Sequence, residues 1–365
     1  MKLELQDINV LPIRTWSWLN VNSISLNEDI PDLAPFNKET ITHTGAESLF
    51  VAPNGDFDKL LELETGIGKN YTEFVLENKN KEVTLFIPEN KKIEEPIIIN
   101  YEFDNDNLVA VDLNRIIAEA GSEVNVVLNY KSSGDEAAFH AGLTFIEAKE
   151  NAVVNISIIQ TLNDNSIHMS DVGTMIHENA VINVALAEVG GKKAIKGYKS
   201  ILRGNESKQF IDAIYFGDKS RFIDINYLAV HEGKFVESNL QLHGALLDES
   251  RKCFRGTIDF RKGCAGAIGE EVEYNLLFSP KVKNLTAPLI LCGEENVQGM
   301  HGANSGKVQE DQLFYMMSRG IDELTAKKII IEASFAPAID KIPVEDIQNE
   351  IIEFVKGRLL GVKQI

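Results

Sequence analysis

One histidine, His301, stands in a glycine-rich run near the C-terminal end of the chain, GMHGANSGK. A neutral imidazole binds borderline metals such as iron, and it also changes charge close to neutral pH. Glycine is retained where the backbone needs unusual dihedral angles or a close approach, and Gly299, Gly302 and Gly306 surround this histidine. The run therefore indicates either a simple lead into the next helix or a histidine presented at a contact surface.

Three further candidate ligands precede His301 in the stretch LILCGEENVQGMH. The thiolate of Cys292 is a soft ligand, whereas Glu294 and Glu295 offer hard carboxylate oxygens. The simpler interpretation of Cys292 is a buried cysteine at the end of a strand. These three residues are therefore secondary candidates for a metal site.

The other sequence signals for chemistry are weak. The chain has 3 cysteines, too few for a disulfide framework, and Cys253 and Cys264 are too far apart for a CxxC-type metal knuckle. Both lie in strand-like sequence, so we expect them in the core. The run from Gly66 to Lys69 lacks the remaining glycine of a dinucleotide-binding loop and the GK[ST] of a P-loop, and neither GxSxG nor HExxH is present. None of these motifs indicates an enzyme.

Three histidines recur in the middle of the chain, namely His140, His168 and His177. Their separations of 28 and 9 residues do not keep all three in one register of a repeat. We therefore expect them to be hydrogen-bonded core or surface histidines and not a row of metal ligands.

Composition limits the classes of partner. The formal net charge is −19, which argues against nucleic acid and against anionic membranes, since both need a clustered basic surface. The first residues contain no apolar signal-peptide core, and no stretch approaches 18 uninterrupted apolar residues. We expect a cytoplasmic protein.

A weak internal repeat runs through the central part of the chain. Copies rich in Val, Ile and Phe follow turn residues at intervals of about 25 to 30 residues, as in a solenoid. The polar residues expected in register are Asn125, Asn155, Asn183, Asp212 and Glu237. Short strands in such rungs favour a β-helix, in which each turn buries its apolar face on its neighbours. A β-sandwich is the structural alternative.

The two ends of the chain have different patterns. Residues 1–82 indicate a small N-terminal α/β region, residues 83–300 the β-helix core, and residues 301–365 a C-terminal helical domain. In the last of these, a helix ends at Gly320, Asp322 caps a second helix running to about Ala338, and Pro343 opens a third that ends near Leu360.

Four stretches resemble the SufB/SufD family of iron–sulfur cluster assembly proteins. The most specific lies at 299–336 and contains HGANSG and EDQLFYMMSRGI. The others are GALLDESRKCFRGTIDFRKG at 244–263, TLFIPENKKIEEPIIINY at 84–101, and LPIRTWSWLNVN at 11–22. The chain is similar to the SufD-type members, because SufB-type members carry carboxylates beside the histidine, where Met300 and Gly302 stand here.

The resemblance implies a mainly β protein with a right-handed parallel β-helix core and helical ends. It also implies pairing with a SufB-type subunit through the last strands and docking of a SufC-type ABC ATPase through the C-terminal helices. His301 falls on the family's histidine and is the candidate ligand for iron or a nascent cluster at a partner interface. Phe314, Tyr315 and Arg319 are the expected partner-binding residues of the first helix, since aromatic and Arg side chains dominate interface energetics.

The function expected from this resemblance is a non-enzymatic scaffold or accessory subunit of the Suf complex. No cofactor is expected to bind tightly to the isolated chain; iron or a nascent cluster is expected to bind transiently in the complex. Two alternatives stay open. One is a SufB-like homo-oligomeric cluster scaffold, with a homodimer when the chain is alone. The other is a polysaccharide-acting β-helix enzyme, disfavoured because no carboxylate pair is apparent in register.

Overall fold

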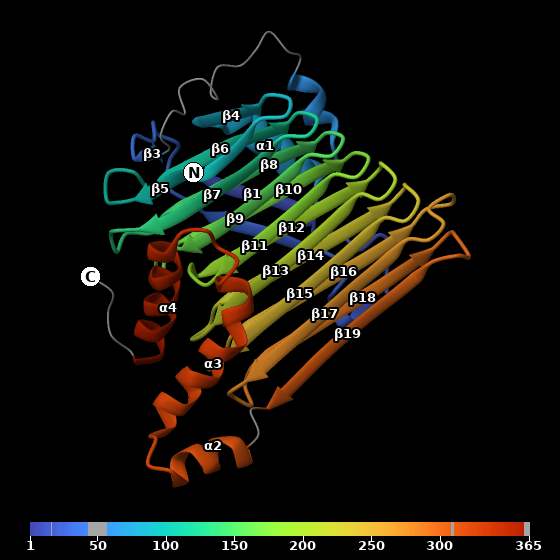
Figure 1. Ribbon diagram of the computed structural model, residues 1–365. Coiled ribbons are helices and arrows are strands. Elements are labelled where there is room, and N and C mark those ends of the chain that lie inside the picture. Colours follow the sequence, from blue (N-terminus) through green and yellow to red (C-terminus); the bar gives the residue numbers. More distant parts are fainter. Residues whose placement is uncertain (16, 43–56, 308–309, 361–365) are drawn as a thin grey trace.

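The centre of the molecule is a parallel β-helix whose successive strands alternate between two sheets (Figure 1). The structure is a computed structural model and describes residues 1–15, 17–42, 57–307 and 310–360. The expected mainly β fold with a parallel β-helix core is confirmed, and the β-sandwich alternative is wrong because the core strands pair in parallel.

Sheet I contains, in chain order, β4 (Lys81–Ile87), β6 (Val109–Ala118), β8 (Phe139–Ala148), β10 (Ile167–Ile176), β12 (Lys193–Leu202), β14 (Phe222–His231), β16 (Arg251–Phe260) and β18 (Lys283–Cys292). Sheet II contains β3 (Glu39–Thr42), β5 (Lys92–Phe103), β7 (Glu123–Ser132), β9 (Val153–Thr161), β11 (Val181–Glu188), β13 (Lys208–Gly217), β15 (Glu237–Leu246), β17 (Ile268–Leu277) and β19 (Gln298–Lys307). Only β3, at one edge, is antiparallel to its neighbour in these two sheets.

The asparagine repeat is partly confirmed as a ladder on sheet II. Asn125, Asn155 and Asn183 are direct partners on adjacent strands. Their side-chain amides hydrogen-bond in series, with N···O distances of 2.9 and 2.8 Å. The expected continuation to Asp212 and Glu237 is wrong. The next partner of Asn183 is Phe210, because this rung takes 27 residues, whereas Asp212 lies 29 residues after Asn183.

The core lies between the two sheets and is built by alternation along each strand. Residues such as Val124, Val126 and Leu128 of β7 face inward and are fully buried among aliphatic and aromatic side chains of both sheets. Burial of this continuous apolar interior, one rung against the next, is what stabilises a solenoid.

The N-terminal region covers the outer face of sheet I. The antiparallel pair β1 (Lys2–Ile8) and β2 (Ile24–Asp29) and the helix α1 (Lys69–Asn78) share one apolar cluster with outward residues of the first rungs, such as Leu113 and Leu143. Two short 3-10 helices, Ser17–Leu19 and Phe57–Glu62, belong to the same region.

Buried polar contacts fasten this N-terminal region to sheet I. Asp171 accepts hydrogen bonds from the backbone N–H groups of Gly66 and Ile67, both at 2.8 Å. Further along, the fully buried pair Arg255–Asp224 reaches outward, and the Arg255 guanidinium also donates to the carbonyl of Val21.

The described part of the chain ends in three helices, of which the last two cover the outer face of sheet II (Figure 1). They are α2 (Glu310–Ser318), α3 (Glu323–Ile339) and α4 (Glu345–Leu360). The predicted cap is confirmed, since the side chain of Asp322 accepts from the backbone N–H of Thr325 at 3.0 Å. Ile331 and Phe335 of α3 are buried against sheet II. No helix in the described part of the chain is long and apolar enough to cross a membrane.

Candidate functional site at the open end of the β-helix

His301 lies on β19, the last strand of sheet II, and not on a loop before a helix. β19 runs through the whole glycine-rich stretch and pairs in parallel with β17, which places His301 directly beside Glu271. Because β18 and β19 are the final strands of their sheets, no further described rung covers their inner faces. His301 is therefore exposed at a place where, one rung earlier, the equivalent side chain is buried.

Hydrogen bonds from β17 and β18 to β19 show which face of β19 points into the β-helix. Ser305 of β19 accepts a hydrogen bond from Asn284 of β18 at 2.9 Å, and one from Asn275 of β17 at 3.2 Å. Since side chains alternate along a strand, His301 and Ser305 emerge on the same face of β19, four residues apart. His301 therefore faces the interior of the β-helix at its exposed end.

A polar network lies one rung inside this end. Lys252 of β16 forms a buried ion pair with Glu273 of β17, and its ammonium group also donates to the Thr286 hydroxyl at 2.9 Å. Thr286 in turn donates to Glu273 at 2.7 Å, and the hydroxyl of Tyr215 donates to the same carboxylate at 3.0 Å. Burial lowers the pKa of Lys252, and the adjacent Glu273 carboxylate opposes that shift.

Glu271 is the second carboxylate of β17 and has a different environment. Its residue is only 3% exposed, and its Oε2 atom has no hydrogen-bond partner. Burial, followed by the nearby Glu273 charge, raises the pKa of Glu271 to about 8. The carboxyl group lies against Gly256 of β16, where an added Cβ would come within 2.0 Å of Oε1. Gly256 therefore provides the space that this carboxyl group occupies.

The secondary candidates lie on the same end but are not assembled around His301. Cys292 is exposed at the last residue of β18, and its thiol donates to the carbonyl of Glu294 at 3.1 Å. The Glu294 carboxylate accepts from the backbone N–H of Gly263 at 2.9 Å, and its pKa is lowered by backbone hydrogen bonds. Among the described residues, no group of three His, Cys, Asp or Glu side chains is arranged to hold a metal ion.

The expected core position of the other two cysteines agrees with the structure. Cys253 and Cys264 are both buried, and burial raises the pKa of Cys253 to about 12 and that of Cys264 to about 11. Neither thiol is a ready thiolate at neutral pH.

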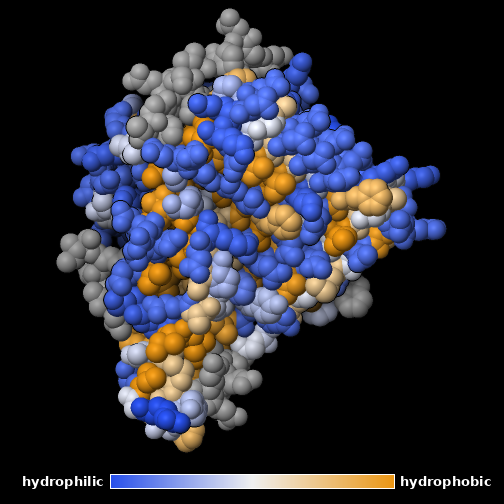
Figure 2. All heavy atoms as spheres, viewed as in Figure 1, coloured by the Kyte–Doolittle hydropathy of each residue, from blue (hydrophilic) through white to orange (hydrophobic). Residues whose placement is uncertain are grey.

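The partner-binding candidates lie on α2, apart from His301. Phe314 is 73% exposed, Tyr315 is 58% exposed, and the guanidinium of Arg319 stacks over the Tyr315 ring at 5.2 Å. Figure 2 shows apolar residues gathered on the surface of the C-terminal helices, where Met317, Leu324 and Ile329 are also exposed.

A second polar cluster inside the core was missed by the sequence analysis. His140 and His168 are direct partners on β8 and β10, with their Nδ1 atoms 2.8 Å apart, and His140 Nε2 lies 2.5 Å from Asp112. The prediction that the histidines do not share a register is therefore wrong for this pair, because one turn of the helix there takes 28 residues. His177 stands apart and is bonded to Glu147.

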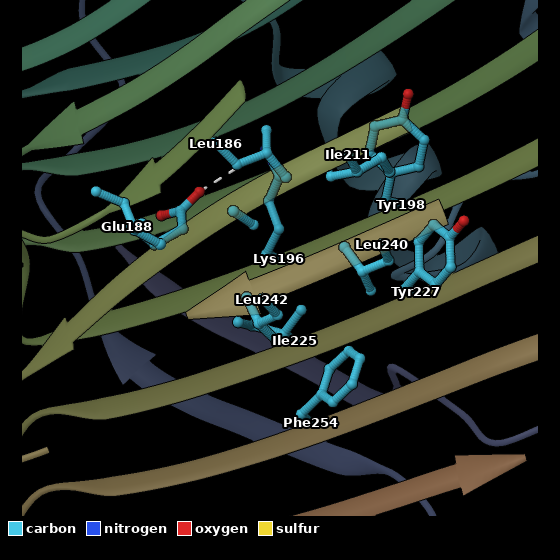
Figure 3. Close-up of a pocket in the computed structure, with 12 residues that line it drawn as sticks. Leu186, Glu188, Lys196, Tyr198, Ile211, Ile225, Tyr227, Leu240, Leu242 and Phe254 are labelled. Carbon is cyan, nitrogen blue, oxygen red and sulfur yellow. Dashed lines mark ion pairs between the residues drawn. The ribbon is translucent and has the colours of Figure 1, made fainter. Parts of the chain in front are cut away.

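The cluster continues along the axis to a buried ion pair. His168 Nε2 is 3.6 Å from Glu188, and Glu188 is 3.7 Å from Lys196. Burial is the main cause that lowers the pKa of both His168 and Lys196 and raises that of Glu188. Figure 3 shows this ion pair among the mostly apolar side chains that line a small cavity. The cavity has a volume of about 20 Å³, enough for one water molecule.

Taken together, these features define a class: a β-helix closed on its sides by the two ends of the chain, with one end of its interior open and lined by a histidine and polar groups. The family model for the SUF system FeS cluster assembly, SufBD core domain, matches residues 101–334. The chain belongs to the SufBD family, as its sequence motifs predict.

Individual relatives agree with this assignment. The chain is 24% identical over 278 residues to the iron-sulfur cluster assembly protein SufD of Bacillus subtilis (strain 168), covering 75% of this chain and 63% of that protein. It is 24% identical over 280 residues to an iron-sulfur cluster assembly SufBD family protein of Staphylococcus saprophyticus, covering 76% of this chain and 60% of that protein. The match thus spans about three-fifths of the length of these relatives.

Proposed function

We propose that this chain is a non-enzymatic scaffold or accessory subunit of a Suf complex, which contributes His301 to the site where iron or a nascent cluster is handled. Membership of the SufBD family supports a role in iron–sulfur cluster assembly. The observation that carries the finer proposal is the position of His301, exposed on the inner side of the last rung. Iron is the cargo in this proposal, and imidazole suits it as a ligand.

The free edges of β18 and β19 support pairing with a SufB-type subunit. Each edge strand presents unpaired backbone N–H and C=O groups that another strand can extend. A partner added there covers His301 and brings its own side chains to the open interior. The lack of any three-ligand group among the described side chains fits a site shared between two chains.

The exposed aromatic surface of α2 supports docking of a SufC-type ABC ATPase. Phe314 and Tyr315 are large, exposed and adjacent to Arg319, which is the composition of an interface anchor. The proposed pairing with a SufB-type subunit uses other groups, the backbone edges of β18 and β19.

The test is His301→Ala in the complex, after co-purification with SufB- and SufC-type proteins from the source cell. An exposed imidazole contributes little to folding, so we expect a change in the free energy of unfolding of about 0.5 kcal/mol or less. We expect cluster assembly by the complex to fall sharply, because packing cannot replace a lost ligand. Co-purification in which neither partner appears, or a destabilised but fully active variant, contradicts the proposal.

A further inference from the structure

Two residues of the open end, Glu271 and His301, occupy partner positions on neighbouring strands. They are direct Cα partners in the parallel pairing of β17 with β19. Neighbouring strands lie about 4.8 Å apart, and partner residues project their side chains on the same face of the sheet. Both side chains therefore belong to the interior face at the exposed end.

The carboxyl group of Glu271 lacks the ion pair and hydrogen bonds that the carboxylate of Glu273 has. Glu273, two residues along and on the same face, is paired with Lys252 and bonded by Thr286. Glu271 is equally buried, yet its Oε2 atom has no hydrogen-bond partner. A buried carboxylate without a cation is costly and is rarely kept unpaired. Burial therefore favours the protonated, neutral carboxyl group, and the interior at this end contains one carboxyl oxygen with no hydrogen-bond partner.

The space around Glu271 is built by the opposite sheet. Gly256 of β16 has no Cβ, and an alanine there would overlap the Glu271 carboxyl group at 2.0 to 2.1 Å. Pro288 of β18 is the partner of Gly256 in the next rung and offers no backbone N–H that could satisfy the carboxylate. On β19, His301 is the direct strand neighbour of Glu271 on the open side.

We propose that Glu271 and His301 together form a two-ligand half-site for Fe²⁺, completed by a partner subunit or by water. This inference rests on the proposed function and adds to it a carboxylate that no sequence motif marks. An imidazole nitrogen and a carboxylate oxygen are a ligand pair that suits iron in the divalent state. Binding of Fe²⁺ by Glu271 would release the proton of the carboxyl group, and the cation would then neutralise the buried carboxylate. Two ligands from this chain agree with the absence of a three-ligand group among its described residues.

The test is anaerobic titration of the full chain with Fe²⁺ alone, comparing wild type with Glu271→Gln, His301→Ala and the double variant. Glutamine keeps the size of the side chain but cannot ionise to a carboxylate ligand. We expect each single variant to weaken Fe²⁺ binding at least about tenfold, and the double variant to be little weaker than either, since both residues act on one ion. The matched control is Glu270→Gln, because Glu270 lies on the other face of β17 and is bonded by Asn239. This control is expected to bind Fe²⁺ as wild type does.

Thermal melting of the metal-free proteins separates binding from folding. Glutamine has nearly the size and the neutral charge of the protonated Glu271 carboxyl group, so the melting temperature of Glu271→Gln is expected to be no lower than that of wild type. If Glu271→Gln binds Fe²⁺ as tightly as wild type while His301→Ala loses affinity, the half-site is overturned. The proposed function is not contradicted by that result. Absence of Fe²⁺ binding by the wild-type chain also overturns the half-site, and the proposed function is then decided by co-purification and by cluster assembly.

Discussion

Histidines of this chain occupy opposite environments, and the difference decides what each can do. His301 is exposed on the last rung, where a metal ion or a partner can reach it. His231 of β14 is fully buried, with Nε2 hydrogen-bonded to the Ser238 hydroxyl at 2.8 Å and Nδ1 without a partner. Burial lowers the pKa of His231 to about 4. The same side chain is thus a candidate ligand at one position and a source of acid sensitivity at the other.

The first prediction follows from this lowered pKa. The unfolded chain binds a proton at His231 near its ordinary pKa of about 6.5, whereas the folded chain does so only near 4. Between these two pH values the unfolded state binds more protons than the folded state, so the folded chain loses stability as the pH falls. The contribution of neutral His231 to the free energy of unfolding is therefore fully present above about pH 6.5 and is lost as the pH falls to 4. The loss amounts to at most about 3.5 kcal/mol, because one pKa unit corresponds to about 1.4 kcal/mol.

The variant that measures this contribution is His231→Gln, whose amide stays neutral but can still bond Ser238. We expect denaturant titrations from pH 7 to pH 4 to show a shallower loss of stability in the variant than in wild type. The difference in the free energy of unfolding between the two proteins should therefore shrink as the pH falls. A difference that is constant with pH would show that His231 is not the titrating group.

The turns between strands form stacked columns, and some positions in them require glycine for lack of space. Gly190 follows β11, and a Cβ there would lie 2.3 Å from the backbone nitrogen and 2.4 Å from the carbonyl oxygen of Leu162 in the preceding rung. Backbone atoms cannot move aside as a flexible side chain can. The close approach of one turn to the next is therefore part of the pairing of the rungs.

The second prediction compares Gly190→Ala with Gly306→Ala. Overpacking in a well-packed region costs about 1 to 3 kcal/mol, and we expect a loss of this size or larger for Gly190→Ala. Gly306 lies on β19, and nothing is within 4 Å of its added Cβ, so its substitution is expected to change stability by about 0.5 kcal/mol or less. Equal unfolding midpoints for the two variants in urea would refute the close-packing explanation.

The C-terminal helices and the β-helix could be predicted from local patterns. Asp322 as a helix cap and Gly320 as a stop have a signature within a few residues, and the structure shows both, with Gly320 at a φ of 89°. The repeat interval likewise indicates stacked short strands. These features depend on neighbours in sequence, which a single chain displays directly.

The other features of the fold and of the candidate site depend on strand register and on contacts between residues that are distant in the sequence. Asp171 bonds the backbone at Gly66, more than 100 residues earlier, and no local pattern announces that contact. At the site, His301 stood out because glycines flank it in sequence. Glu271 did not stand out, because its burial beside His301 appears only when the rung length between β17 and β19 is known. Rung lengths vary along the chain, so such pairs could not be read from spacing alone.

The two ends of the chain cover the sides of the β-helix and leave two surfaces for partners. The N-terminal region packs on sheet I, while α3 and α4 pack on sheet II through Ile331, Phe335 and Ile351. The last rung and the surface of α2 stay exposed (Figures 1 and 2). Deleting the chain from residue 309 would uncover the apolar outer face of sheet II, so that deletion tests folding as well as docking. Point variants on α2 test docking alone.

The last prediction concerns the double variant Phe314→Ala with Tyr315→Ala. Both side chains are exposed and contribute little to the core, so we expect the melting temperature of the chain to stay within about 2 °C of wild type. Truncating two aromatic anchors at an interface costs about 2 kcal/mol or more, which corresponds to at least about 30-fold weaker binding of the SufC-type ATPase. Trp18→Ala is the matched control, because Trp18 is similarly exposed, at 71%, but lies in the N-terminal region. Binding of the ATPase, measured by calorimetry on the purified proteins, should fall in the double variant and not in the control. Unchanged affinity in the double variant would place the ATPase elsewhere on the molecule, and an equal loss in both would indicate a nonspecific effect of removing exposed aromatic surface.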